Sequence, residues 1–412
     1  MPLEVITVGG SLAGLMTSIA LRRLGHNVRI LERAPTPLLH DQGAGIVAGG
    51  EIPVFMQKYD RTKTLIAVTS HQRLYLDKTG RSKERENRAQ RMTSWDLIYH
   101  ICRANFDGLA SPYVEGHDMP GELDGEGVGR YEHGCAVTKL VEDGHRVRVT
   151  YKDTKPGGES HELQHATADF VIIADGSSST VRKSLCPSSP ERTYAGYVAF
   201  RGTVPETELS PEAAEVFVEK FPFYHGGHVQ ILGYTIPGRE GTLAPGSRLV
   251  NWVWYVNMEG ESDEYRQTMT DKDGNTHRWT LPTGGHMQDS VWEARKHAAD
   301  AILPPRFAEL LKKTREPFVQ AITDLKPPAD KKCWLLGGKA VLAGDALAGF
   351  RPHTAASTAQ AALHALLLGR MFDNEMDWSD YESTVMRFAT DTQDQGVFLG
   401  NRSQFGSHPF SE

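Results

Sequence analysis

Short apolar runs alternate with helical patterns along this chain, and this order predicts a mixed α/β fold. Residues 5–8 are apolar and largely β-branched, and a glycine-rich turn at 9–14 follows them. Apolar positions at helical spacing then run through 15–24, and a second apolar run occupies 28–31. Together these features predict a β–turn–α–β unit with Glu32 at the tip of its second strand.

Two later stretches also place small or acidic residues directly after a buried strand. Residues 168–174 predict a strand that ends in Asp175-Gly176, and residues 341–345 predict one that ends in Gly344-Asp345. A helix rich in small residues, 355–371, comes next. Because the carboxyl ends of parallel strands share one edge of a sheet, we expect the stretches 9–14, 174–182 and 343–357 to converge on one ligand.

The remaining patterns predict antiparallel strands and shorter helices. Several β-rich, aromatic runs in 192–258 predict an antiparallel sheet over an aromatic-lined pocket, with core packing as the alternative role for most of the aromatics. Alternation in 112–151 predicts a β-meander with a hairpin near 153–161, and the strongly charged segment 78–91 favours a solvated hairpin or loop over an anion-docking surface. Helices are expected at 52–59, from a Thr93 or Ser94 cap to Arg103, and within 287–315.

Composition narrows the functional class. The length of 412 residues suggests two domains or one elaborate one, and 39% hydrophobic and 24% charged residues are ordinary for a soluble globular protein. The net charge of −7 disfavours a nucleic-acid partner. The four cysteines are far apart, which argues against a zinc site, an iron–sulfur cluster or a disulfide scaffold. No apolar run approaches the length of a membrane span, and the first strand leaves no room for a signal peptide. We therefore expect a cytoplasmic protein with no metal.

The glycine turn at 9–14 has the chemistry of a dinucleotide site. Gly9 permits the tight turn, Gly14 permits close packing of the helix, and the helix N-terminus attracts a diphosphate. Glu32 can accept hydrogen bonds from ribose hydroxyls, and Ser11 stands where the second glycine of this fingerprint is usual. A parallel-sheet turn without a ligand is the alternative. Because a second glycine fingerprint is absent, a tightly bound dinucleotide with its own redox centre explains the chain better than a dehydrogenase reaction with NAD.

Three motifs carry a resemblance to a known family. VGGSLAG with Glu32, IIADGSSSTVR and VLAGDALAGFRPHTAAS resemble the motif set of the single-component flavin aromatic hydroxylases, the group that contains 4-hydroxybenzoate 3-hydroxylase. TYAGYVAFRG, WVWYVNMEG and RWTLPTGGH are similar to segments of its 2,6-dihydroxypyridine 3-hydroxylase branch. The resemblance covers nearly the whole chain. It departs from the wider family at Ser11 and in the position of His353, which here follows the proline.

The resemblance implies an FAD-dependent monooxygenase that uses NADH or NADPH transiently. It implies an α/β fold, α+β overall, with a Rossmann-like FAD-binding domain on a parallel sheet and a substrate domain on an antiparallel sheet. We expect the FAD-binding domain at 1–72, 95–183 and 332–390, the substrate-binding domain at 73–94 and 184–331, and a C-terminal tail at 391–412. The oligomeric state stays open, with a homodimer as one form.

Motif by motif, the resemblance also implies cofactor-binding residues. The expected FAD contacts are Ser11, Leu12 and Ala13 at the pyrophosphate, Glu32 and Arg33 at the adenosine ribose, Gly45 and Ile46 near the flavin ring, Arg103 on the pyrophosphate side, Asp175 at FAD and the nicotinamide cofactor, Asp345 at the ribityl chain, and Pro352, Thr354, Ala355, Ala356 and Ser357 at the pyrimidine edge of the flavin.

The implied reaction inserts one oxygen atom of O₂ into a small electron-rich aromatic ring through a flavin C4a-hydroperoxide. A base or a hydrogen-bonded relay should remove the phenolic proton. The candidate pocket residues are His353, His228, Tyr234 and Gln230, with His225, Tyr197 and Arg201 as further candidates. Oxidative decarboxylation (1-hydroxylation) of a 4-hydroxybenzoate-type acid, in some cases prenylated, stays open, as does a flavin oxidase, an epoxidase or a flavin-binding protein without hydroxylase activity.

Overall fold

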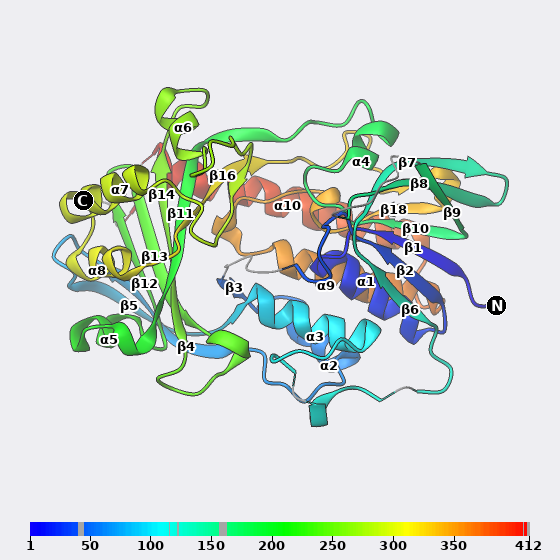
Figure 1. The fold of residues 1–412 in the computed structure, drawn as a ribbon, viewed down its shortest axis with the longest axis horizontal. Coiled ribbons are helices and arrows are strands. Elements are labelled where there is room, and N and C mark those ends of the chain that lie inside the picture. Colours follow the sequence, from blue (N-terminus) through cyan, green and yellow to red (C-terminus); the bar gives the residue numbers. More distant parts are fainter. Residues whose placement is uncertain (40–44, 115, 122, 156–162, 407, 410–412) are drawn as a thin grey trace.

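The computed structural model describes residues 1–39, 45–114, 116–121, 123–155, 163–406 and 408–409. It consists of two parts, each built on a large sheet, with long helices between and behind them (Figure 1). The six-stranded sheet lies towards the N-terminal end and the nine-stranded sheet lies at the opposite side of the molecule. The predicted combination of a parallel and an antiparallel sheet is confirmed.

The six-stranded sheet holds the predicted β–turn–α–β unit. Its strand order is β17 (Trp334–Leu335), β18 (Ala340–Leu342), β10 (Phe170–Ile173), β1 (Glu4–Val8), β2 (Asn27–Leu31) and β6 (Gly129–Glu132). All neighbouring pairs are parallel except β17 with β18. Since β18, β10 and β1 are adjacent, the three predicted strand ends share one edge.

Helices cover this sheet because their apolar faces are buried against it. Helix α1 (Leu12–Arg23) packs on α9 (Ser357–Phe372), where a Cβ added to Gly369 would lie 3.7 Å from Ala20. Helix α3 (Trp95–Asp107) starts where the Ser94 hydroxyl accepts a hydrogen bond from the Leu97 amide at 3.2 Å, so Ser94 is the cap. The short helix α2 (Ile52–Tyr59) confirms the prediction for 52–59.

A three-stranded antiparallel sheet flanks this part of the molecule. It contains β7 (Cys135–Asp143), β8 (Arg146–Asp153) and β9 (Leu163–Ala168), so the meander prediction is correct from residue 135 onwards. It is wrong for the described residues of 112–128, which hold a one-turn helix, η1 (Gly116–Asp118), and an isolated bridge between Ser111 and Val114. Most of the hairpin predicted near 153–161 lies outside the described residues.

The nine-stranded sheet forms the other half of the molecule. Its order is β15 (Thr280–Leu281), β16 (Phe318–Asp324), β11 (Thr193–Pro205), β14 (Leu249–Asn257), β13 (Val229–Ile236), β12 (Lys220–Gly226), β4 (Val68–Leu76), β5 (Ser82–Ser94) and β3 (Gly45–Val47). Only β12 with β4 is parallel. The antiparallel sheet predicted for 192–258 is confirmed.

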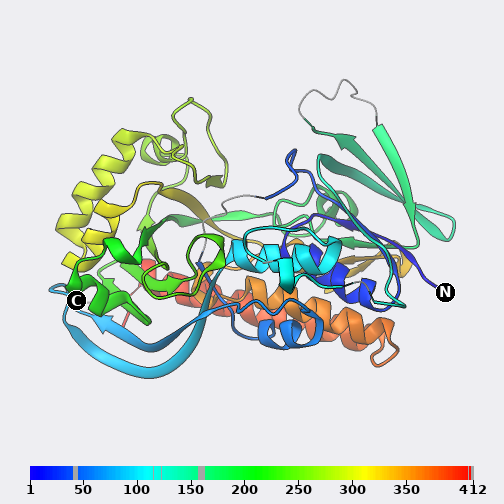
Figure 2. The same ribbon diagram turned by 60° about the horizontal axis from the view of Figure 1, so that its bottom comes forward.

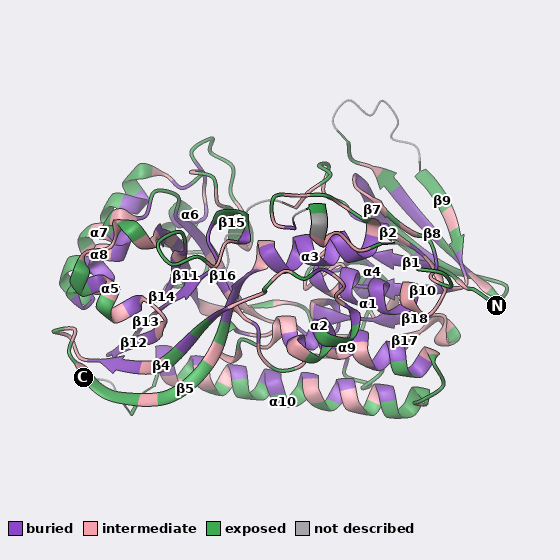
Figure 3. Ribbon diagram, turned by 90° about the horizontal axis from the view of Figure 1, so that it is seen from below, coloured by how far each residue is buried: buried purple, intermediate pink, exposed green. Residues whose placement is uncertain are grey.

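The charged segment 78–91 contains the turn and most of the second strand of a hairpin. Most of it belongs to β5, a strand of 13 residues that forms a long curved hairpin with β4 (Figure 2). Residues 82–91 of β5 are exposed or half-buried on both faces, so the strand shows no alternation of apolar and polar positions (Figure 3). Of the two forms predicted for this segment, the solvated hairpin is therefore confirmed in part, and the loop is wrong.

The two faces of the nine-stranded sheet differ in what covers them. Phe200, Trp252 and Trp254 lie in a core with side chains of the helices α7 (Asp289–Ile302) and α8 (Pro305–Lys313), while α5 (Pro211–Phe217) adds Phe217. The predicted helical stretch 287–315 is thus two helices, separated at Leu303 and Pro304. Alternate residues of the strands, among them Tyr197 and Tyr255, form a separate cluster on the opposite face.

Helix α10 (Trp378–Gln404) spans both parts of the molecule (Figure 3). It has 27 residues, and part of the expected tail, 391–404, lies within it. Its Asn401 side chain accepts a hydrogen bond from Arg351 at 2.8 Å, and Gly400 lies so close that an added Cβ would be 2.4 Å from the Tyr197 hydroxyl. The helix therefore ties residues 351–354 to the aromatic face of the nine-stranded sheet. The division into domains stays a prediction.

Candidate active site

Three glycines bring the three predicted strand ends together. A Cβ added at Gly9 would lie 2.5 Å from the Ala174 carbonyl oxygen, and Gly9 has a φ of +98°. At Gly344 the added atom would lie 2.4 Å from the Ala13 Cβ, and at Gly349 it would lie 3.3 Å from the Ser177 Cβ. Each contact joins a different pair of stretches, so the predicted convergence is confirmed.

An arginine that the sequence analysis did not single out ties the second stretch to the third. Arg182, in α4 (Thr180–Leu185), donates hydrogen bonds to the carbonyl oxygens of Ala346 at 3.1 Å and Leu347 at 2.9 Å. A third hydrogen bond of 2.6 Å reaches the Lys326 carbonyl. Burial lowers the pKa of Arg182, so these carbonyl dipoles stabilise a guanidinium that is largely removed from water.

The start of α1 presents backbone amides at the first strand end. Ser11 is the N-cap residue, but its hydroxyl makes no capping hydrogen bond, and the first turn contains no acidic residue. A Cβ added at Gly14 would lie 1.9 Å from the Gly9 carbonyl oxygen, so the helix must pack directly on the turn. Ser11, Leu12 and Ala13 thus stand where unpaired N–H groups favour a phosphate.

Glu32 closes this site from the second strand. Its carboxylate accepts hydrogen bonds from the Gly10 amide at 2.7 Å and the Ala34 amide at 2.8 Å, and only 7% of the residue is exposed. These two amides hold the carboxylate beside the glycine turn, where each oxygen keeps a further lone pair for a ligand hydroxyl. The neighbouring Arg33 is exposed and lies near enough to Asp175 to influence its carboxyl.

Arg103 lies behind the same turn in a cluster of aromatic residues. Its guanidinium stacks 3.7 Å from the ring centre of Tyr131, whose hydroxyl donates to the Gly10 carbonyl oxygen at 3.2 Å. The same guanidinium donates to the Tyr99 hydroxyl at 2.7 Å and pairs with Asp107 at 2.9 Å. The sequence analysis placed Arg103 near the pyrophosphate but missed Tyr99 and Tyr131, which connect it to the glycine turn.

Two carboxyl groups at the other strand ends are buried at a cost. Burial raises the pKa of Asp175 to about 6, and its Oδ1 atom has no hydrogen-bond partner in the described part of the chain. Burial also raises the pKa of Asp345 to about 6, although the charge of Arg192 and a hydrogen bond with Ser357 act in the opposite direction. Unpaired buried polar atoms are rare in folded proteins and point to a missing partner.

The loop before α9 provides a further set of backbone donors. Ala355 has a φ of +53°, and the cap residue Ala356 offers no side-chain acceptor to the first amides of α9. Pro352 and Ala355 are exposed, whereas Ser357 is half-buried. The first turn of α9 itself contains no acidic residue, and the helix N-terminus carries a partial positive charge.

His353, in the same loop, reaches the aromatic face of the nine-stranded sheet. Its Nε2 atom lies 2.9 Å from the Tyr197 hydroxyl, and its ring lies 4.5 Å from the ring of Tyr255. Burial and the charge of Arg351 lower the pKa of His353 to about 3. Arg351 in turn pairs with Asp324 at 2.6 Å. The imidazole is therefore neutral at physiological pH, with a network of polar groups behind it.

Comparisons with known proteins agree with this geometry. The chain is 31% identical to 2,6-dihydroxypyridine 3-monooxygenase of Paenarthrobacter nicotinovorans, over 91% of this chain and 84% of that protein. It is 24% identical to 6-hydroxynicotinate 3-monooxygenase of Bordetella bronchiseptica, over 90% of this chain and 82% of that protein. A family model described as FAD binding domain-like matches residues 194–324. The chain belongs to the FAD-dependent aromatic monooxygenases.

The fold of this monooxygenase is similar to that of solved relatives. The structure of 2,6-dihydroxypyridine-3-hydroxylase from Arthrobacter nicotinovorans aligns with a TM-score of 0.82 at 26% identity, covering 99% of this chain and 94% of that one. A substrate complex of salicylate hydroxylase, with a TM-score of 0.66 and 18% identity, covers 99% of this chain and 90% of that one and shares the fold. The predicted family, fold class and FAD cofactor are confirmed.

The residues at the three strand ends fit FAD. The unpaired Asp175 Oδ1 and the two uncapped helix N-termini offer acceptors and donors that a dinucleotide can use. A side chain at Gly9 or Gly344 would clash with the neighbouring motif, so glycine lets these backbone segments approach one another closely. The FAD contacts expected at Ser11, Glu32, Asp175, Asp345 and the 352–357 loop therefore stand as proposals that this geometry supports.

The candidate pocket residues of the monooxygenase do not all lie together. The Tyr234 hydroxyl donates to the Gly45 carbonyl oxygen at 2.7 Å, so its proton is already used. Gln230 accepts a hydrogen bond from Ser403 at 2.7 Å, and the exposed His228 lies 3.0 Å from the Gln404 carbonyl oxygen. Gln230 and His228 thus contact the C-terminal end of α10, whereas His353 lies in the loop before α9.

His225 was a further candidate in the same region. Only 4% of the residue is exposed, and its ring stacks on that of His408 with 3.6 Å between their centres. Burial lowers the pKa of His225 to about 3, and His408, His353 and Arg402 add to this effect. Its Nδ1 atom has no hydrogen-bond partner among the described residues.

Gly45 and Ile46, expected near the flavin ring, are placed by the nine-stranded sheet. They belong to β3, which pairs with β5 at Ser94 and Thr93. Gly43 and Ala44, which come directly before Gly45 in the sequence, lie outside the described residues. The β3 strand thereby joins the two halves of the molecule at the site.

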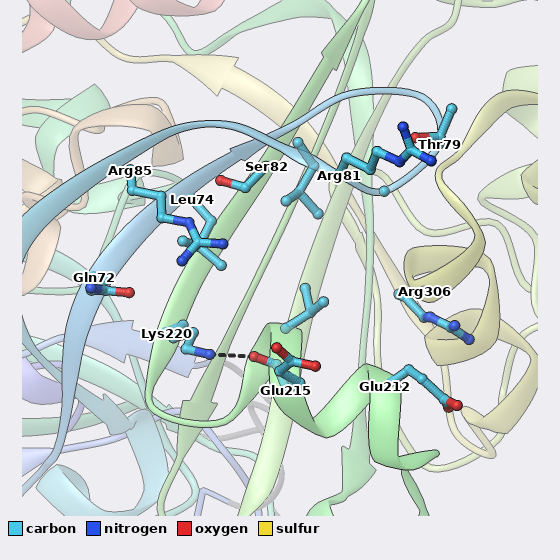
Figure 4. Close-up of a pocket in the computed structure, with 13 residues that line it drawn as sticks. Gln72, Leu74, Thr79, Arg81, Ser82, Arg85, Glu212, Glu215, Lys220 and Arg306 are labelled. Carbon is cyan, nitrogen blue, oxygen red and sulfur yellow. Dashed lines mark hydrogen bonds between the residues drawn. The ribbon is translucent and has the colours of Figure 1, made fainter.

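One surface pocket lies away from the three strand ends. A surface pocket of about 510 Å³ lies between the β4–β5 hairpin and α5, with Arg81, Arg85, Lys220 and Glu212 among its lining residues (Figure 4). Among the described residues, no cluster of His, Cys, Asp and Glu is arranged to hold a metal ion. No helix in the described ranges is both long and apolar enough to cross a bilayer.

Proposed function

We propose that this enzyme hydroxylates a small, electron-rich phenolic or hydroxypyridine-type ring with O₂ and NADH or NADPH. The observation that supports it most is the position of the neutral His353 and its Tyr197 partner, next to the uncapped start of α9 and facing the aromatic sheet. The names of the relatives, which act on dihydroxypyridine and hydroxynicotinate, support the same substrate class. Bound FAD, once reduced, supplies the activation of O₂.

The chain itself orients the ring and handles its proton. In the tautomer with a proton on Nε2, His353 donates to the Tyr197 oxygen and keeps Nδ1 as an acceptor for a ring hydroxyl. The pairing of Arg351 with Asp324 holds this loop in place. Tyr197 and Tyr255, both fully buried, provide apolar surface that excludes water from the ring.

The amides at the start of α9 have a separate task. Negative charge that develops on a bound cofactor near residues 355–357 is stabilised by the helix N-terminus. Asp175 and Asp345 lie at the two neighbouring strand ends, and Asp345 would hold a hydroxyl of the cofactor's ribityl chain. Each of these groups binds or orients, and none of them acts as a nucleophile.

The test is a screen of phenols, hydroxybenzoates and hydroxypyridines for stimulated oxidation of NADH and NADPH by the FAD-loaded enzyme. With ¹⁸O₂, a hydroxylase gives a product that carries one labelled oxygen atom in place of a ring hydrogen. Oxidative decarboxylation gives a product with one labelled oxygen atom in place of the carboxylate, which leaves as unlabelled CO₂, whereas an oxidase gives hydrogen peroxide and an unlabelled product. Either of the last two outcomes would replace the proposed reaction.

A further inference from the structure

Three polar side chains from neighbouring strands meet at the backbone of Gly45. Tyr234 on β13 is paired with Asn251 on β14, and Arg201 lies on the adjacent β11. The Tyr234 hydroxyl and the Arg201 guanidinium donate to the Gly45 carbonyl oxygen, at 2.7 and 3.2 Å. The Gly45 amide donates to Asn251 Oδ1 at 3.1 Å.

Glycine is the residue that permits this approach. A Cβ at position 45 would lie 2.7 Å from Asn251 Cγ and 2.8 Å from Tyr234 Cε2, closer than carbon atoms can pack. The backbone of β3, the edge strand of the same sheet, therefore lies directly against the side chains of Tyr234 and Asn251.

The hydrogen bonds to Gly45 leave several donors unused. Asn251 is fully buried, yet its Nδ2 atom has no hydrogen-bond partner in the described part of the chain. The Nε atom of Arg201 is also buried and unpaired, and no carboxylate of the described residues lies within ion-pair distance of Arg201. The Nδ2 donor of Asn251 and the Nε donor of Arg201 are thus buried without an acceptor among the described residues, which is costly, so this arrangement calls for an acceptor beyond those that the described residues supply.

We propose that Arg201 and Asn251 bind an anionic oxygen on the ring of the aromatic substrate, which is a carboxylate or an ionised ring hydroxyl. A guanidinium and an amide NH₂ group can only donate, and the Gly45 carbonyl already accepts two hydrogen bonds, so a cationic substituent finds no acceptor here. This inference rests on the proposed hydroxylase function and names the charge of its substrate.

The surroundings of these donors suit a flat ring. The Arg201 guanidinium lies 5.3 Å from the ring centre of Phe318, and the Tyr234 ring meets the edge of Phe221 at 5.1 Å. Tyr197 and Arg201 share one face of β11 because they are four residues apart. One face of the sheet thus presents apolar rings, the anion-binding donors and, through Tyr197, the proposed proton-handling His353.

Two pairs of ring compounds test the inference on the FAD-loaded enzyme. The pair 4-hydroxybenzoate and 4-hydroxybenzamide differs in a carboxylate, and the pair 2,6-dihydroxypyridine and 2,6-dimethoxypyridine differs in ionisable ring hydroxyls. Dissociation constants come from changes in the visible flavin spectrum on titration. The variants are Arg201→Met, Arg201→Lys and Asn251→Asp, and Arg85→Met on the exposed strand β5 is the control.

We expect wild type to bind the anionic member of at least one pair more tightly. Arg201→Met should weaken that ligand by about 10- to 100-fold, the range for one charge-assisted hydrogen bond, and change the neutral member less than about threefold. Arg201→Lys should recover part of the loss. Asn251→Asp keeps the acceptor for Gly45 but places a carboxylate beside the ligand, so it should weaken the same ligand. Arg85→Met should bind all four like wild type.

Other results overturn the inference. The inference is wrong if Arg201→Met weakens the binding of both members of a pair equally. It is also wrong if wild type binds the neutral member more tightly than the anionic one. Loss of FAD from Arg201→Met and Asn251→Asp would show that these donors serve the cofactor instead. If wild type incorporates labelled oxygen while Arg201→Met keeps the preference for the anion, this inference fails and the proposed function stands. If no ring compound stimulates NAD(P)H oxidation, the proposed function itself fails.

Discussion

Replacing Asp345 by asparagine should stabilise the apoprotein while weakening its hold on FAD. The pKa of this carboxyl rises from 3.8 to about 6 in the folded chain, chiefly because burial disfavours the charged form. Above pH 6 the folded protein therefore carries a buried charge that the unfolded chain exposes to water. The shift of roughly 2 pKa units corresponds to about 3 kcal/mol at most, at about 1.4 kcal/mol per unit.

The sign of the pH dependence follows from the same shift. Between pH 3.8 and about 6 the folded state holds a proton that the unfolded state has lost, so folding stability falls as the pH rises through this window. Above about pH 6 the folded state bears the full free-energy cost of the buried Asp345 charge. The asparagine side chain of the variant carries no charge at any pH, so the stability difference between Asp345→Asn and wild type should grow from near zero at pH 3.5 to its maximum above pH 6.5.

Urea unfolding of both apoproteins at several pH values measures this difference, and FAD titration of the same samples measures the cofactor affinity. The exposed Asp394, changed to asparagine, is the control and should leave both quantities unaltered. The reasoning is refuted if Asp345→Asn is no more stable than wild type at pH 7.5, or if its advantage is the same at pH 4. Unchanged FAD affinity would refute the assignment of Asp345 to the cofactor.

Four further substitutions probe the site. His353→Asn should lower kcat by roughly 10²- to 10⁴-fold if the imidazole handles the ring proton, and Tyr197→Phe by about tenfold, with FAD content unchanged, as stopped-flow and steady-state kinetics would show. Arg182→Met removes three hydrogen bonds to backbone carbonyls and should cost about 2–4 kcal/mol of stability in urea unfolding, with weaker FAD binding. Gly344→Ala forces a Cβ to within 2.4 Å of Ala13 at a φ of +58°, so FAD retention after gel filtration should drop.

The sequence predicted those parts of the site whose residues act through local geometry. Glycine turns, buried strands and an acid at a strand end are visible in a few adjacent residues, which is why the convergence of 9–14, 174–182 and 343–357 could be foreseen. The hydrogen bonds from Arg182 to backbone carbonyls and the stacking of Arg103 on Tyr131 depend on partners far away in the chain. No local pattern marks such contacts. The sequence left a hairpin and a loop open at 78–91, because most residues of β5 face solvent on both sides and show no alternation of apolar and polar positions.

The unpaired groups on the two sheets have a common consequence. Asp175 Oδ1 belongs to the parallel sheet, whereas Asn251 Nδ2 and Arg201 Nε belong to the antiparallel one, and each lacks a partner among the described residues. A cofactor that satisfies the first and a substrate that satisfies the others would each stabilise the folded state by mass action, by an amount that grows with the logarithm of ligand concentration over Kd. If both proposals hold, the burial of these polar groups is fully favourable only with cofactor and substrate bound, and the stability of the fold then depends on the ligands that the reaction needs.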